Sequence, residues 1–196
     1  DSAETADALG VLLFSQSQLL SNLFGTDGPA VEELFTRGQD RKHVFVGKNL
    51  CHLAFYVTLE TVVLGAFAIL FGQTPLLGPY LFIAVWMTVL NVAAGNVGSI
   101  FLSFPLSRMA ARRAIEQQPE RQEGCARMAV RMFAGMVGLA AALPVAVLTW
   151  LGEAYVGWVG YAFAALYALV GWGASLFVAS GLLESREEDL IEAMEP

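Results

Sequence analysis

Long runs of apolar residues dominate this 196-residue sequence and predict its secondary structure. A helix needs roughly 20 apolar residues to cross the hydrocarbon core of a membrane. Five runs of about this length predict spanning helices over residues 8–25, 50–72, 79–104, 132–151 and 155–183. The first run carries several Ser, Gln and Asn side chains, so by itself it would also fit an amphipathic helix on the membrane surface.

The positions of the basic residues favour five crossings in series. Five crossings put residues 26–49, 105–131 and 184–196 on one side of the membrane, and all 11 Lys and Arg residues lie there. The opposite connections, 73–78 and 152–154, are tight turns. Positively charged segments stay in the cytoplasm during insertion. The sequence therefore predicts a multi-pass inner membrane protein with its N-terminus outside and its C-terminus in the cytoplasm.

The composition agrees with a chain surrounded by lipid. Hydrophobic residues make up 56% of the sequence and charged residues 15%, against roughly 45–50% and about 25% in an ordinary soluble domain. The net charge of −7 offers no basic face, so no nucleic-acid partner is expected. We predict an all-α membrane protein, a bundle of five transmembrane helices forming one domain over residues 1–196. Because the chain starts at Asp1 without a basic signal segment, we also expect a fragment or a processed product.

Side chains that carry chemistry are sparse. His43 and His52 lie in no metal-binding spacing, and Cys51 and Cys125 are far apart in the sequence. No Gly-x-x-x-x-Gly-Lys-Ser/Thr run is present to hold a nucleotide phosphate. We expect no metal site, no directly bound cofactor and no enzyme activity in this chain.

Residues 29–38 carry the start and stop signals of a short helix. Pro29 suits the first helical turn, acidic residues follow where the helix dipole favours anions, and Gly38 can end the helix. Its apolar face would consist of Val31, Leu34 and Phe35. Such a helix is either a membrane-surface element or a docking element for a soluble partner, and the residues alone favour neither.

Glu60 is the one formal charge inside a confident span, close to the midpoint of residues 50–72. Asn91 lies at a similar distance from the same tight turn, so the two side chains should reach the same depth. A carboxylate there is costly, so Glu60 should face the protein interior, protonated or with a polar partner. One hypothesis is that Glu60 and Asn91 hydrogen-bond and fix helix packing. The other is that Glu60 lines the translocation path or the dimer seam, where it meets substrate or water. A further polar side chain in a span is Asn96.

Small residues spaced four apart form helix-packing surfaces, because they let helix backbones approach closely in lipid. The residues expected in such contacts are Gly95, Gly98, Ser99 and Gly138.

Three short motifs resemble the permease subunits of ATP-binding-cassette (ABC) exporters of the type-2 class. They are the run from Asn22 to Gly28 with the later Glu33-Leu34, the stretch Val44-Phe-Val-Gly-Lys-Asn-Leu50, and the run from Asn96 to Pro105. The resemblance implies a permease that pairs with a second permease, as a homo- or heterodimer. It also implies a cytoplasmic ABC ATPase subunit that hydrolyses ATP on its behalf.

By the same resemblance, residues 29–37 would be the coupling helix that docks on the ATPase, and residues 41–48 would continue it toward the second span. The docking residues would be Pro29, Val31, Glu32, Glu33, Leu34, Phe35, Arg37, Arg41 and Lys48. The alternative function is a membrane scaffold or assembly protein that transports nothing.

Overall fold

The computed structural model describes residues 10–11, 40–102, 136, 138 and 140–194. Every regular element in this part of the chain is helical, in agreement with the predicted all-α class. The predicted first span, the coupling helix at 29–37 and the connection 105–131 lie outside the described residues, apart from the helical pair at 10–11. The count of five spanning helices therefore stays a prediction.

Helix α3 (Arg41–Leu70) covers the second predicted span up to residue 70 and begins well before it. Asp40 caps its N-terminus, because the side-chain carboxylate accepts a hydrogen bond of 2.9 Å from the backbone N–H of Lys42. The helix ends at Leu70, and Gly72, two residues further on, has a left-handed φ of 66° that favours glycine. Residues 41–49, which were assigned to a cytoplasmic segment, are thus the first turns of the same helix.

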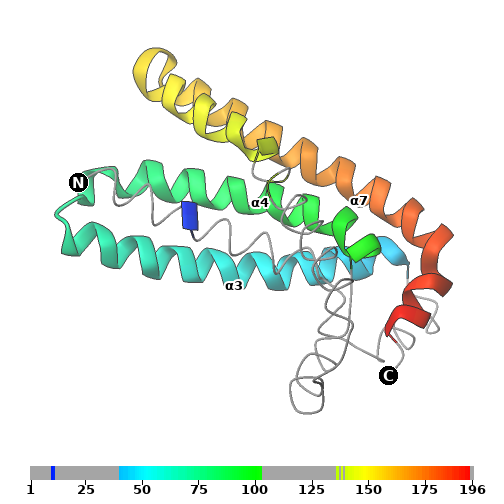
Figure 1. Cartoon of the computed structure of the whole chain (residues 1–196). Helices are drawn as coiled ribbons and strands as arrows, with labels where there is room; N and C mark the ends of the chain where they lie inside the picture. Colours follow the sequence, from blue (N-terminus) through cyan, green and yellow to red (C-terminus); the bar gives the residue numbers. More distant parts are fainter. Residues whose placement is uncertain (1–9, 12–39, 103–135, 137, 139, 195–196) are drawn as a thin grey trace, which may run out of the picture.

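Helix α4 (Leu77–Leu102) follows after the short 3-10 helix η1 (Thr74–Leu76). Figure 1 shows that α3 and α4 lie side by side and antiparallel. The tight turn predicted at 73–78 is confirmed, but it lies earlier in the chain, because α3 ends at Leu70 and α4 already begins at Leu77.

A second hairpin joins the helix Ala140–Leu151 to α7 (Trp158–Met194) through the π-helix η2 (Gly152–Val156). A β-carbon on Gly160 would overlap the Cα of Gly152 and the carbonyl oxygen of Leu148. The two arms of this hairpin therefore touch backbone to backbone at its turn. Helix α7 continues past the predicted end of the span at 183, in line with a helical acidic tail.

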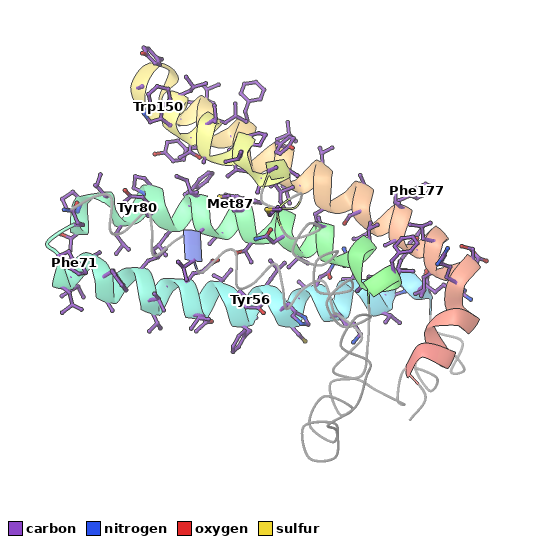
Figure 2. The ribbon with its side chains drawn as sticks, in the orientation of Figure 1. Tyr56, Phe71, Tyr80, Met87, Trp150 and Phe177 are labelled. Carbon is purple, nitrogen blue, oxygen red and sulfur yellow. The ribbon has the colours of Figure 1, made fainter. Side chains whose placement is uncertain are left out.

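Three helices are long and apolar enough to cross a membrane: Arg41–Leu70, Thr74–Phe101 and Trp158–Arg186. The described part of the fourth predicted span, Ala140–Leu151, is shorter. Large apolar side chains cover the outer faces of the bundle, and Phe177 on α7 is 73% exposed (Figure 2). A surface of this kind is compatible with a membrane protein, because lipid can cover it.

The core lies where α7 packs along α4 and where α4 packs along α3. Met87 of α4 lies in one apolar cluster and Tyr56 of α3 in another, and both residues are labelled in Figure 2. Fully buried alanines such as Ala164 and Ala168 keep α7 close to its neighbours. Of the predicted packing residues, Gly138 is buried, and a β-carbon on it would lie 3.4 Å from the Cβ of Ala94.

Candidate functional site

Polar side chains are buried along the faces by which the helices meet. These residues, here called the polar stripe, are Asn49, Glu60, Thr88, Asn91, Asn96, Ser99, Thr149, Ser175 and Ser180. A buried polar group without a hydrogen bond costs free energy, so the partners of these side chains decide how the helices fit together. The three intramembrane residues singled out in the sequence, Glu60, Asn91 and Asn96, all belong to the stripe.

Glu60 lies at the middle of α3 and is fully buried. Thr88 Oγ1 on α4 donates a hydrogen bond to Glu60 Oε1. The expectation that Glu60 faces the protein interior with a polar partner is therefore confirmed. In the described part of the chain, Lys and Arg occur only at positions 41, 42, 48 and 186, near the other end of the bundle. The donor shown at the Glu60 carboxyl is thus a neutral hydroxyl.

The polar partner shown for Glu60 is Thr88, and the expected hydrogen bond between Glu60 and Asn91 stays a prediction. In the structure α3 ends at Leu70 and α4 already begins at Leu77, so the turn is centred earlier than the apolar runs imply. The register between the two helices shifts by about one helical turn, which places Thr88 opposite Glu60. Asn91 faces the neighbouring hairpin, since its Oδ1 lies 3.6 Å from the position of a β-carbon on Gly138.

A second cluster ties three helices together and is here called the amide junction, formed by Asn49 of α3, Asn96 of α4, and Trp172 and Ser175 of α7. The Asn49 amide is oriented so that both of its ends are satisfied. In this orientation its Nδ2 donates to Asn96 Oδ1 (2.7 Å) and to the Phe45 carbonyl (3.2 Å). Its Oδ1 accepts from Asn96 Nδ2 and from Trp172 Nε1, both at 3.0 Å.

The remaining bonds of the amide junction complete this network. Asn96 Nδ2 also donates to Ser175 Oγ (3.0 Å), and Ser175 Oγ donates to the Trp172 carbonyl (2.7 Å). Ser99 Oγ donates to the Asn96 carbonyl (3.2 Å) one turn along α4. Both side-chain amides therefore use all their donors, and α3, α4 and α7 share one continuous set of hydrogen bonds.

Sequence reasoning missed four residues of these two clusters, namely Asn49, Thr88, Trp172 and Ser175. A signal for Asn49 was present, because it lies three helical turns before Glu60 and therefore on the same face of α3. Threonine, serine and tryptophan in an apolar run give no such signal, since each also fits a lipid-facing or packing position. Their roles depend on which helix lies opposite.

The two ends of the bundle differ in chemistry. At the end where α3 begins, Lys42 Nζ lies 5.6 Å from the Phe177 ring centre, and the Arg186 guanidinium lies 4.8 Å from that of Phe101. At the opposite end the exposed aromatics Trp150, Tyr155 and Trp158 surround the hairpin turn; Figure 2 labels Trp150 there.

Two of the predicted docking residues, Arg41 and Lys48, lie on the first turns of α3 and are partly exposed. The others, at positions 29–37, lie outside the described residues. Within the described part of the chain no three metal-binding side chains come together.

Comparisons of the chain with protein-family models, curated proteins and solved structures found no match.

Proposed function

We propose that this chain is the transmembrane permease subunit of an ABC exporter and moves a substrate outward with ATP hydrolysed by a partner ATPase. The observation that carries the proposal is the continuity of α3. Its 30 residues extend about 45 Å, longer than the roughly 30 Å of hydrocarbon. The segment that follows the expected coupling region is therefore the start of a spanning helix, and force applied there would reach the bundle.

The two ends of the bundle support the proposed orientation. Arg41, Lys42 and Lys48 on α3 and Arg186 on α7 belong to one end, which we assign to the cytoplasm. The exposed Trp and Tyr side chains at the other end are typical of a membrane–water interface. This assignment places the expected coupling helix on the side where an ATPase would be.

Glu60 favours a packing role in the conformation described. Its carboxyl is fully buried and accepts a hydrogen bond from Thr88, so a path along it would have to open by separating α3 from α4. A second permease and lipid would cover the exposed apolar faces of α3 and α7.

The test is isolation of the tagged chain from native membranes, followed by identification of bound proteins. We expect an ABC ATPase subunit to be recovered. Phe35→Ala should lower its recovery more than Arg41→Ala, because buried apolar anchors contribute more affinity than charges at the rim. Recovery of assembly factors without an ATPase would favour the scaffold alternative. Equal ATPase recovery with both variants would contradict docking through residues 29–37.

A further inference from the structure

The lead-in of α3, defined as residues 41–48, joins the expected docking region to the membrane part of the bundle. Asn49, the first residue after the lead-in, is fully buried although it lies next to the exposed Leu50. Its side-chain hydrogen bonds go to Asn96 of α4, to Trp172 of α7 and to the Phe45 carbonyl of α3 itself. The amide junction therefore holds α3 at the point where it enters its apolar part.

Apolar contacts hold the lead-in itself against α7. Val44 and Phe45 are buried and pack with Ala179 and Leu183 of α7. The Phe45 carbonyl also accepts a hydrogen bond from Asn49 Nδ2. The lead-in is thus attached to α7 both through its apolar face and through the amide junction.

The helices are held together differently at the amide junction and around Glu60. Near the middle of the bundle, Thr88 of α4 donates a hydrogen bond to Glu60 of α3. At the amide junction two side-chain amides bond reciprocally and reach α7 as well. Such a paired amide network is directional, so it specifies the register of three helices where apolar packing alone would allow sliding.

We propose that the amide junction couples the lead-in of α3 to α4 and α7, so that a displacement of the lead-in is passed to the outer halves of these helices. Asn49 and Asn96 are then positioning residues that transmit movement between the ATPase side and the membrane part. This inference rests on the proposed function for the source of the movement. The mechanical attachment itself is a property of the chain alone.

The attachment is tested by hydrogen–deuterium exchange on the purified chain in lipid nanodiscs. Asn96→Leu removes the amide partner of Asn49, and we expect exchange across residues 41–48 to rise at least tenfold. Thr88→Val is the matched control: it removes a buried hydrogen bond from the same helix and should leave exchange at 41–48 unchanged. Unchanged exchange in Asn96→Leu, or an equal rise in both variants, would overturn the attachment.

Transmission is tested in the complex with the ATPase. Spin labels are attached to cysteines introduced by Val62→Cys on α3 and Phe163→Cys on α7, after Cys51 and Cys125 have been changed to Ser. The distance between the labels reports the separation of the halves of α3 and α7 that lie away from the lead-in. The double variant Asn49→Leu/Asn96→Leu replaces both amides by apolar groups, so neither is left unsatisfied and assembly should persist. We expect ATP to change the label separation in the parent, and by less than half as much in the double variant.

An equal ATP-dependent change in both proteins, or no change in the parent complex, would overturn transmission. If no ATPase binds the parent chain, the proposed function fails, and the exchange experiment alone decides the attachment.

Discussion

Glu60 shows how one residue limits the arrangement of its neighbours. A carboxyl group at the middle of an apolar helix must be buried against a donor, and Thr88 supplies that donor. The same logic applies to Asn49 and Asn96, whose amides each need several partners at once. Because each of these side chains needs a partner on the facing helix, they determine which rotations of the helices are allowed.

Thr88→Val should destabilise the bundle by about 0.6 to 1.7 kcal/mol, which are the average and the largest values measured for hydrogen bonds between membrane helices. Glu60→Gln keeps an oxygen that can accept from Thr88, so we expect it to cost less. Equilibrium unfolding in mixed micelles measures both. If Glu60→Gln is the more destabilising change, the bond from Thr88 is not what holds the carboxyl.

At the scale of elements, the two hairpins are made in different ways. The α3–α4 hairpin turns through Gly72 and η1, and its helices meet through side chains such as those of Glu60 and Thr88. The second hairpin closes through η2 and Gly157, whose φ of 60° only glycine adopts easily. In that hairpin Gly160 touches the backbone of Gly152, so its helices approach as closely as backbones can.

Gly160→Ala should destabilise the second hairpin by roughly 1–3 kcal/mol, because the added methyl group overlaps backbone atoms that cannot move aside. Gly173→Ala is the control, since it lies on the same helix and a β-carbon there meets nothing within 4 Å. Thermal unfolding in detergent compares the two variants. Equal melting temperatures would contradict the tight backbone contact at Gly160.

At the scale of the whole molecule, charge and aromatic residues divide the bundle into two ends. The basic residues described lie where α3 begins and where α7 passes residue 186, and the exposed Trp and Tyr side chains lie around the second hairpin turn. Figure 1 shows that both turns, α3–α4 and the one before α7, lie at the end away from the C-terminus. In a membrane, the basic end would lie at one membrane–water interface and the Trp- and Tyr-rich end at the other.

Cysteine labelling in intact cells tests this orientation. With the native cysteines changed to Ser, a Cys introduced at Glu153 should react with an impermeant maleimide from outside. A Cys introduced at Arg121 should react only after permeabilisation. The reverse labelling pattern would contradict this orientation. It would mean that the lead-in of α3 lies outside the cell, where no cytoplasmic ATPase could reach it.

For the described part of the chain, the sequence by itself determined that the apolar runs are helices and that Glu60 is buried. Apolar runs and helix caps are local properties, and the cost of a charge in hydrocarbon does not depend on which helix lies opposite. The tertiary structure alone decided the partners: Thr88 for Glu60, and Asn96 with Trp172 and Ser175 around Asn49. Partner choice depends on the register and rotation of whole helices, and a shift of a few residues in one turn changes every pair along the interface.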